Sequence, residues 1–371
     1  MSDILKIYGK DYKNMTITLL KEGDVIRRLP ERDKIIGIKP NLVSPTPAFL
    51  GATTHTEIVE GVITFLKDNG YENILVMEGS WVGDTTQDAF DVCGYNELAK
   101  KLNVALIDLQ QSAYIEEEVE GLTLRICKDV KDIDYLINIP VLKGHCQTKI
   151  TCALKNMKGV LPNSEKRHFH AMGLHKPIGY LNKLIHQDLI IVDHICGDLD
   201  FEDGGNPVSR DCIMLGYDPV LVDSYVCRLL GYSVDEVPYI GVAESLKVGT
   251  SNIDDASVER LVEEGSGFTP VKDDEEVMLI HRKAVDIRDR VMEVDSCSAC
   301  YGTLIPALDS LREEGILEGF NETIAIGQGY RGKTGCLGVG NCTAGFDFSI
   351  KGCPPTEEDI KEGLRTYIKH K

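Results

Sequence analysis

The chain has 371 residues, of which 43% are hydrophobic, and this is enough for about two domains that each bury a core. Its 40 basic and 59 acidic side chains leave a formal net charge of −19. A surface this negative repels phosphate backbones and anionic lipid, which disfavours general nucleic-acid or membrane-surface binding. No apolar run approaches the ~20 residues of a membrane span, and residues 1–15 lack the pattern of a secretion signal. We therefore expect a cytoplasmic protein with no nucleic-acid or membrane partner.

Strands and helices alternate through the first part of the chain. The sequence predicts strands at 34–38, 74–77, 104–109, 135–139 and 189–192, and helices at 56–69 and 95–102. Thr53 or Thr54 is the expected cap of the first of these helices. The alternation predicts an α/β fold, a doubly wound and mostly parallel sheet.

Polar residues follow several of the predicted strands. They are Lys39-Pro40-Asn41, Glu78-Gly79-Ser80, Lys143-Gly144-His145 and Asp193-His194. In sheets of this kind, ligands bind at the carboxyl ends of the strands, so we expect a site there.

A polar, turn-rich linker at 249–275 separates this region from a second one. Beyond it the sequence predicts strands at 277–281 and 323–326, helices at 300–314 and 356–368, and a glycine-rich stretch at 327–345. Thr356 is the expected cap of the last helix. We therefore divide the chain into an α/β domain at 1–255 and a smaller, cysteine-rich α/β domain at 256–371.

Residues 141–187 concentrate positive charge. Their single acid is Glu165, and their eight basic residues are Lys143, Lys149, Lys155, Lys158, Lys166, Arg167, Lys176 and Lys183. This segment is either a solvated basic loop or a pocket for a small anionic substrate or cofactor. In the pocket interpretation, the binding residues are Lys143, Thr148, Lys155, Asn156 and Lys158.

Histidine is the natural proton-transfer residue near neutral pH, so His145 is the acid–base candidate, with Lys149 as a second catalytic candidate. Three further histidines, His168, His170 and His175, could instead hold a transition metal.

Acidic residues form another set. Asp193, Asp198, Asp218 and Asp223 could bind a divalent cation, orient a histidine, or simply cap helices.

Five of the twelve cysteines lie in the last 75 residues. Cys297 and Cys300 form a C-x-x-C at a predicted helix start, where backbone amides favour thiolates. With Cys342 and Cys353 they could enclose a [4Fe–4S] cluster or a zinc ion, or they could act as a redox thiol pair. Glycines nearby and Pro354 after the last cysteine favour the cluster, and Cys336 could replace one of the four.

The order of the motifs resembles a known family. The series runs Lys39-Pro-Asn41, Thr53-Thr54-His55, Glu78-Gly79, Lys143-Gly-His145, Leu154-Lys-Asn-Met-Lys-Gly159, Asp193 and Asp218-Pro219 to Asp223. Over about residues 34–230 it resembles the domain of unknown function 362 family. The resemblance implies an iron–sulfur protein but no particular reaction. Relatives often append a ferredoxin insert with eight cysteines that this chain lacks, so a single cluster is expected.

Three hypotheses follow. The first is an oxidoreductase that couples one [4Fe–4S] cluster to the bound anion, with a possible ferredoxin-like electron partner. The second is a carrier or maturation protein that holds a cluster, metal or cofactor without turnover. The third is a metal-dependent racemase or lyase. No dinucleotide-binding G-x-G-x-x-G follows the first predicted strands, which disfavours a nicotinamide-dependent dehydrogenase.

Overall fold

The computed structural model describes residues 2–202, 204–205, 207–273, 287, 289–296 and 298–371. The chain divides into two compact units. The first unit comprises residues 1–144, 148–169 and 174–279, and the second comprises 145–147, 170–173 and 280–371. Each unit is described by itself.

A nine-stranded sheet forms the centre of the first unit. In spatial order its strands are β13 (Gly267–Lys272), β12 (Val258–Glu264), β1 (Ile4–Tyr8), β11 (Pro207–Gly216), β10 (Leu189–Asp198), β7 (Tyr135–Ile139), β2 (Ile36–Pro40), β3 (Ile74–Glu78) and β4 (Ala105–Asp108). The five strands from β10 to β4 are mutually parallel, whereas β11 runs antiparallel to both of its neighbours. Every residue of β2 and β7 is buried, as expected for strands covered on both faces.

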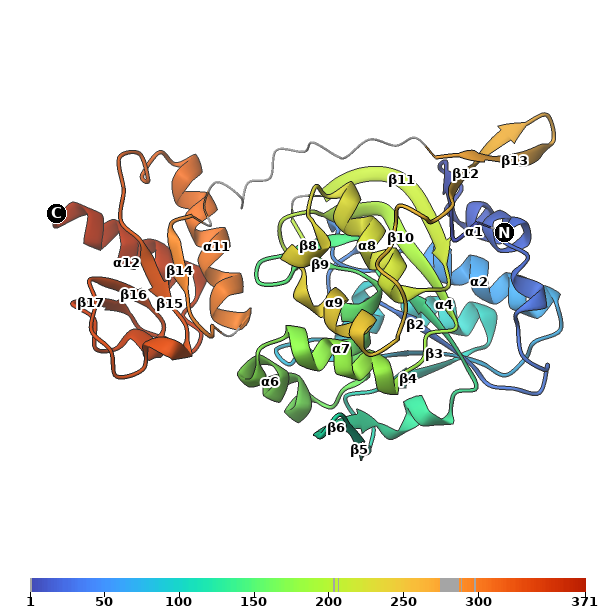
Figure 1. Ribbon diagram of the computed structural model, residues 1–371, viewed down its shortest axis with the longest axis horizontal. Helices are drawn as coiled ribbons and strands as arrows, with labels where there is room; N and C mark the ends of the chain where they lie inside the picture. Colours follow the sequence, from blue (N-terminus) through green and yellow to red (C-terminus); the bar gives the residue numbers. More distant parts are fainter. Residues whose placement is uncertain (1, 203, 206, 274–286, 288, 297) are drawn as a thin grey trace. The chain divides into compact units, whose positions relative to one another are not determined.

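Helices cover both faces of this sheet (Figure 1). The described helices that lie wholly or mainly in the first unit are α1 (Tyr12–Glu22), α2 (Thr56–Asp68), α3 (Thr86–Val92), α4 (Tyr95–Leu102), α5 (Ala153–Asn156), α6 (Asn163–Met172), α7 (His175–Leu184), α8 (Pro219–Leu229) and α9 (Pro238–Ser245). Helices α1, α2 and α4 pack together on one face, and α5, α7, α8 and α9 pack together on the other. The doubly wound, mostly parallel α/β fold is therefore confirmed.

The start of α2 differs from the prediction. Its cap residue is His55, whereas Thr54 uses its hydroxyl to accept from the Asn41 backbone N–H (2.8 Å) and to donate to the Ile139 carbonyl (2.8 Å). Thr54 thus joins the carboxyl ends of β2 and β7. The expectation that Thr53 or Thr54 caps the helix was wrong, because tertiary partners take the Thr54 hydroxyl.

The order of strands reverses beside β2. After β2 the chain adds β3 and β4 on one side, and then places β7 and β10 on the other. A reversal of this kind leaves a crevice at the carboxyl ends of the two strands, which is where open α/β sheets bind ligands.

Two small two-stranded sheets and a hairpin accompany the large sheet. Strands β5 (Tyr114–Val119) and β6 (Leu122–Cys127) pair with each other, as do β8 (Lys143–His145) and β9 (Lys149–Thr151). The β12–β13 hairpin extends the large sheet through pairing of β12 with β1. The first unit therefore continues past residue 255, where the domain boundary was expected.

The second unit contains a four-stranded parallel sheet. Its strands are β14 (Val291–Glu293), β15 (Ile324–Ile326), β16 (Leu337–Val339) and β17 (Phe348–Ile350), and they lie in that order. Helices α11 (Ser298–Glu313) and α12 (Glu357–Lys369) pack against each other. Thr356 caps α12 by accepting from the Asp359 backbone N–H (3.1 Å), as predicted. The predicted strand at 277–281 lies outside the described residues.

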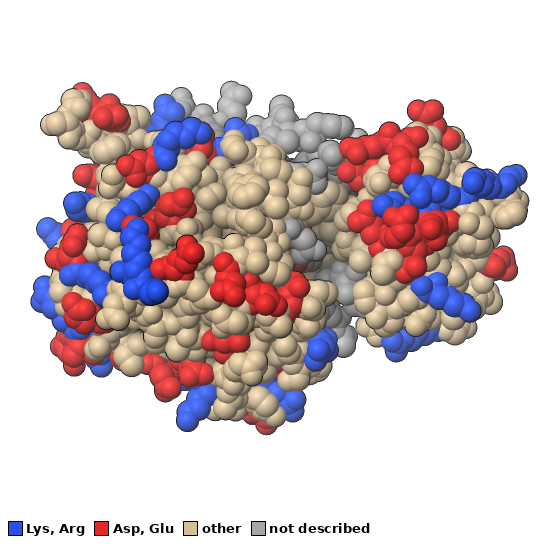
Figure 2. All heavy atoms as spheres, turned by 180° about the vertical axis from the view of Figure 1, so that it is seen from behind, with Lys and Arg blue, Asp and Glu red and all other residues tan. Residues whose placement is uncertain are grey.

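The surface of the chain carries both signs of charge. Figure 2 shows acidic and basic side chains interspersed over the visible face of the first unit. Among the residues that the structure describes, no helix is long and apolar enough to cross a membrane.

Candidate functional site

A buried ion pair joins the carboxyl ends of β2 and β3. The ammonium of Lys39 contacts both carboxylate oxygens of Glu78, at 3.0 and 2.8 Å, and both side chains are almost wholly buried. The backbone N–H groups of Leu42 and Gly79 donate to the same carboxylate, at 3.1 and 2.8 Å. Burial lowers the pKa of Lys39 while the charge of Glu78 opposes that change.

Gly159 packs closely against this ion pair. A Cβ at Gly159 would lie 2.1 Å from the Glu78 Oε1 and 2.6 Å from the Lys39 Nζ. Only a residue without a side chain fits there. The Gly159 segment therefore packs directly on the pair and brings Lys158 with it.

Two further lysines share Glu202, in the segment after β10. The buried ammonium of Lys155 pairs with the Glu202 carboxylate and also donates to the Thr151 hydroxyl (3.2 Å). Lys143, which is fully buried, donates to the carbonyls of Ala52 (2.6 Å) and Glu202 (2.9 Å) and contacts the Asn41 Oδ1 at 3.4 Å. Lys143 thus ties together the loops that follow β2 and β10.

Lys158 and Lys166 complete the group. The ammonium of Lys166 donates to the carbonyls of Gly79 and Ser80, both at 2.8 Å. Burial and, to a smaller extent, the charge of Lys39 lower the pKa of Lys166 to about 8. Burial, followed by the charges of Lys155 and Lys166, lowers the pKa of Lys158 to about 7.

We call these residues the lysine cluster: Lys39, Lys143, Lys155, Lys158 and Lys166, with the carboxylates of Glu78 and Glu202. The sequence predicted Lys143, Lys155 and Lys158 as binding residues, and the structure brings them together. The sequence indicates Lys39 and Glu78 as strand-end residues and as members of the family motif series but does not pair them, although opposite charges after adjacent strands were a usable signal. Glu202 was missed, because a loop residue 47 positions from Lys155 gives no local signal.

The other predicted binding residues have different surroundings. The Thr148 hydroxyl donates to the Ile150 carbonyl at 3.0 Å. The Asn156 amide donates to the Asn138 Oδ1 (2.7 Å), which begins a buried chain of amides. The chain continues from Asn138 to Gln187 (2.6 Å) and from Gln187 to Asn182 (2.6 Å). Asn156 thereby fixes α5 against the end of β7.

Lys149, a catalytic candidate, is directed toward η5 (Val234–Glu236). Its ammonium lies 2.5 Å from the Glu236 carboxylate and 5.0 Å from the centre of the Tyr232 ring. Its pairing with Glu236 lowers the pKa of that carboxyl.

The histidines of the basic segment lie on several elements. His145 ends β8, and its Nδ1 accepts from the Gln147 backbone N–H at 3.0 Å, so a neutral ring carries its proton on Nε2. His168 contacts the Glu165 carboxylate at 3.2 Å, and His175 stacks on Tyr239 at 6.0 Å between ring centres. The side chain of His170 lies outside the described residues.

The acidic set divides between two roles. Asp193 accepts from the backbone N–H of His55 (2.8 Å) and contacts its Nδ1 at 2.8 Å. Burial lowers the pKa of His55, but the charge and hydrogen bond of Asp193 outweigh burial, so the pKa is raised overall. Asp193 thus orients a histidine, one of the expected roles, although the histidine is His55.

The remaining aspartates of that set bond to backbone. Asp223 accepts from the N–H groups of Ala153 (2.7 Å) and Leu154 (3.2 Å) at the start of α5. Asp218 caps α8, and Asp198 accepts from two N–H groups of the following loop. In the part of the chain that the structure describes, no three His, Cys, Asp or Glu side chains form a group that could hold a metal ion.

Three described cysteines lie at one edge of the small sheet. Cys342 follows the carboxyl end of β16, Cys353 follows that of β17, and Cys300 is in the first turn of α11, which follows β14. A Cβ on Gly340 would lie 3.5 Å from the Cys300 Sγ, so Cys300 is beside the Cys342 loop. Cys297 lies outside the described residues.

The loops of Cys342 and Cys353 are joined by hydrogen bonds. The Asn341 N–H donates to the Gly352 carbonyl (2.9 Å), and the Gly352 N–H donates to the Asn341 side chain (3.0 Å). Cys336, by contrast, precedes β16. At about 3.3 Å per residue, the three residues of β16 separate Cys336 from the carboxyl edge by about 10 Å.

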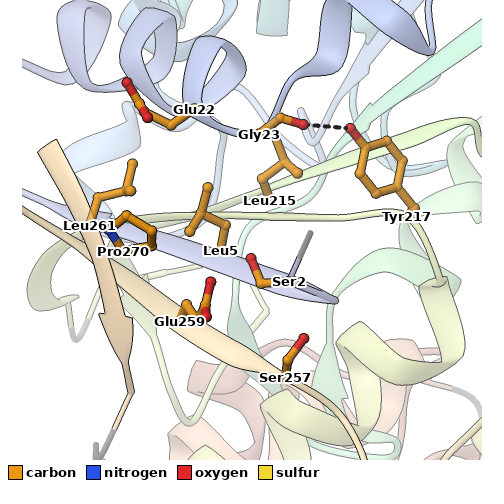
Figure 3. Close-up of a pocket in the computed structure, with 10 residues that line it drawn as sticks. All are labelled: Ser2, Leu5, Glu22, Gly23, Leu215, Tyr217, Ser257, Glu259, Leu261 and Pro270. Carbon is orange, nitrogen blue, oxygen red and sulfur yellow. Dashed lines mark hydrogen bonds between the residues drawn. The ribbon is translucent and has the colours of Figure 1, made fainter.

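A separate cavity of about 460 Å³ lies elsewhere in the first unit (Figure 3). Its lining residues are Ser2, Leu5, Glu22, Gly23, Leu215, Tyr217, Ser257, Glu259, Leu261 and Pro270. They lie in or directly beside β1, β11, β12, β13 and the end of α1, and the set shares no residue with the lysine cluster.

Comparison with known proteins defines the class of the chain. Residues 36–228 match the family described as domain of unknown function 362, and this range covers more than half of the chain. The protein therefore belongs to that family, as the resemblance over residues 34–230 indicated. The matched range includes the whole lysine cluster.

Individual similar proteins are distant. One is a thylakoid-associated protein of Synechocystis sp., 24% identical over 225 residues that cover 58% of this chain and 68% of the relative. Another is the lactate racemase apoprotein of Thermoanaerobacterium thermosaccharolyticum, with 13% identity and a TM-score of 0.38. That similarity covers 57% of this chain and 54% of the racemase chain, so the chain spans about half the length of that protein.

Proposed function

We propose that the first unit binds a small anion, a carboxylate or phosphate, at the lysine cluster. The observation that carries the proposal is the gathering of five lysine side chains at the ends of β2 and β3 and in the loops beside them. Lys155, Lys158 and Lys166 are near enough for their charges to lower the pKa of a neighbour. An anion bound there would offset that repulsion and would accept charge-assisted hydrogen bonds.

The position of the cluster supports the proposal. It lies where the strand order reverses, and open α/β sheets bind ligands at this point. Lys143, Lys155 and Glu202 also join loops from different strands, so the cluster is held from several sides.

Sulfate binding to the intact chain, measured by titration calorimetry, tests this proposal. Lys155→Met should weaken sulfate binding by about tenfold or more, because a hydrogen bond to a charged group contributes about 1.5–3 kcal/mol. The matched control is Lys183→Met, which removes an exposed lysine of the same basic segment. Equal affinities for both variants, or no saturable binding to the unaltered chain, would contradict the proposal.

We propose also that the second unit holds a [4Fe–4S] cluster through Cys297, Cys300, Cys342 and Cys353. Thiolates at one edge, with glycines that let backbone N–H groups approach sulfur, suit such a cluster. The described side chains do not form a group of three or more metal ligands. The proposal therefore depends on the positions of the cysteines at the ends of the strands and at the start of α11. The cluster would supply one-electron transfer, which with the anion site makes the protein an oxidoreductase served by a ferredoxin-like partner.

Two cysteine variants test the ligand set. Cys353→Ser should lose most of the iron found in protein prepared without oxygen, whereas Cys336→Ser should keep it. Iron lost equally from both variants, or retained by Cys353→Ser, would show that the assignment is wrong.

A carrier without turnover is the second candidate function. The observation that favours it is the ion pair between Lys149 and Glu236. This pair occupies the ammonium of a residue that the sequence had predicted to be catalytic. His145→Gln separates the two candidates when sulfate affinity is compared with anion-dependent oxidation of a reduced viologen dye. Unchanged affinity with abolished turnover supports the enzyme, and no turnover in either protein supports the carrier.

A further inference from the structure

The cavity of about 460 Å³ has an apolar floor on one face of the large sheet (Figure 3). Leu5 is paired with Leu215 across β1 and β11, and with Glu259 across β1 and β12. Leu261, two residues beyond Glu259, is paired with Pro270 across β12 and β13. Paired residues and residues two apart share a face of a sheet, so these side chains form one surface. The volume is within the range of small-molecule pockets, about 300–1,000 Å³.

The cavity is at the other end of the strands from the lysine cluster. Because β11 is antiparallel to both β1 and β10, β1 has the same direction as the five parallel strands. Leu5 is the second residue of β1, and Glu259 is the second residue of β12, which is parallel to β1. The cavity therefore lies toward the amino ends of these strands. At its side, the Tyr217 hydroxyl donates to the Gly23 carbonyl (3.5 Å), which connects the end of β11 to the end of α1 (Figure 3).

The charged residues that line the cavity are both acidic. Glu22 ends α1 and Glu259 lies on β12, and Figure 3 shows them on opposite sides of Leu5 and Pro270. Among the residues that the structure describes, neither carboxylate has a hydrogen-bond or ion-pair partner. The carbonyl end of α1 adds partial negative charge beside Glu22. The lining therefore favours a positively charged ligand.

Two cationic side chains are close to the lining without being part of it. The guanidinium of Arg28 lies 4.0 Å from the centre of the Tyr217 ring. Lys272 is opposite Glu259 in the pairing of β12 with β13, but its side chain is exposed and forms no described ion pair with Glu259. The two carboxylates of the lining are thus left for a ligand to neutralise.

We propose that this cavity binds an organic ammonium ion that carries an apolar body. The body lies on Leu5, Leu215 and Leu261, and the ammonium is attracted by Glu22 and Glu259. The same carboxylates repel the small anions proposed for the lysine cluster, so the two sites select ligands of opposite charge.

Binding of 2-phenylethylammonium to the full chain at pH 7, measured by saturation-transfer NMR titration, tests the inference. We expect saturable binding at least about threefold tighter than that of 2-phenylethanol, which has a similar shape but no charge. Ethylammonium, which keeps the charge but lacks the ring, should bind at least about tenfold more weakly than 2-phenylethylammonium. Equal affinity for the amine and the alcohol, or no saturable binding of the amine, would overturn the inference.

Variants that replace a carboxylate by an amide of the same size locate the site. Glu22→Gln and Glu259→Gln should each weaken binding of 2-phenylethylammonium by about threefold, because each removes one partly exposed ion pair with the ligand. The matched control is Glu263→Gln, which changes an exposed glutamate of β12 outside the cavity lining and should leave the affinity unchanged. Unchanged affinity in both cavity variants, or an equal loss in Glu263→Gln, would show that the amine binds elsewhere and would overturn the assignment.

Discussion

The large, mostly parallel sheet and the small parallel sheet carry different side chains at the carboxyl ends of their parallel strands. At the carboxyl edge of the large sheet, charged side chains are buried and bonded to protein atoms, as Lys39 is to Glu78 and Lys155 to Glu202. At the same edge of the small sheet, Cys353 is exposed and Cys342 is half-buried. The charged groups of the first edge are paired within the chain, whereas two of the three thiols described at the second edge are open to solvent.

This contrast agrees with the two different sites that we propose for the two edges. A buried cluster of like charges can be prepared in advance because its own carboxylates and carbonyls stabilise it. A thiolate site for a metal cluster gains its stabilisation only when the cluster binds. Four predictions test this contrast, in decreasing order of expected size.

Removing one partner of the buried ion pair should have the largest effect. Glu78→Ala leaves Lys39 buried without its carboxylate and should reduce the free energy of unfolding by about 3–5 kcal/mol. Urea unfolding followed by the fluorescence of Trp81, the single tryptophan, measures this loss.

Two controls accompany that measurement. Lys39→Met combined with Glu78→Leu should recover much of the loss, because no buried charge remains. Glu117→Ala breaks the part-exposed pair with Lys131 and should cost less than about 1 kcal/mol. If Glu78→Ala lowered the free energy of unfolding as little as Glu117→Ala does, the Lys39–Glu78 pair would not stabilise the carboxyl edge of the large sheet.

The anion affinity of the lysine cluster should fall as the pH rises. The pKa values of about 7 for Lys158 and about 8 for Lys166 are lowered from 10.5, and an anion binds the ammonium forms. Sulfate, whose charge is constant in this range, should bind more weakly from pH 6 to 9, by up to about tenfold per pH unit for each titrating lysine.

The same shifts have the opposite consequence for stability. Between the lowered pKa and 10.5 the unfolded chain holds more protons than the folded chain, so stability without an anion should rise with pH in that window. Titration calorimetry from pH 6 to 9 measures the sulfate affinity. In Lys158→Met this affinity should change less with pH than in the unaltered chain. An affinity that stays constant in the unaltered chain would contradict the assigned role.

The pKa of His55 should depend on Asp193. Asp193→Asn removes the charge that outweighs burial, so the pKa of His55 should fall. Proton NMR titration of the imidazole measures the change. Because the raised pKa stabilises the folded chain below pH 6.5 and this contribution is lost as pH rises through the folded value, Asp193→Asn should also weaken that pH dependence. An unchanged His55 titration would show that the pairing does not control it.

The smallest effect is expected at the cap of α12. Thr356→Ala removes the hydroxyl that accepts from the Asp359 N–H and should cost about 1 kcal/mol of local stability. Hydrogen exchange of α12 amides, read by mass spectrometry, should accelerate while that of α2 stays the same. Faster exchange in both helices would show that the two units do not respond separately.

The sequence identified what local patterns determine. The buried strands β2, β3 and β7 are nearly uninterrupted apolar runs, and α2 has a clear apolar face, so these elements were predicted closely. Strands β14, β16 and β17 have only three residues each, and β16 lies within a glycine-rich stretch, so periodicity could not predict them.

For the lysine cluster, the sequence predicted Lys143, Lys155 and Lys158 but not the residues that they contact. Glu202 pairs with Lys155, which lies 47 positions earlier in the sequence. Glu236 pairs with Lys149, which lies 87 positions earlier. Pairings across such distances depend on the folded topology. The same applies to Cys336, because only the direction of β16 shows that it lies away from the edge that carries Cys342.

The most direct test of the central claim is a metal analysis of protein purified without oxygen, with its visible spectrum. About four iron and four sulfide per chain, with absorbance that bleaches on addition of dithionite, is the predicted result. One zinc per chain and no sulfide would contradict the redox assignment and would leave the second unit as a structural metal site beside an anion-binding first unit.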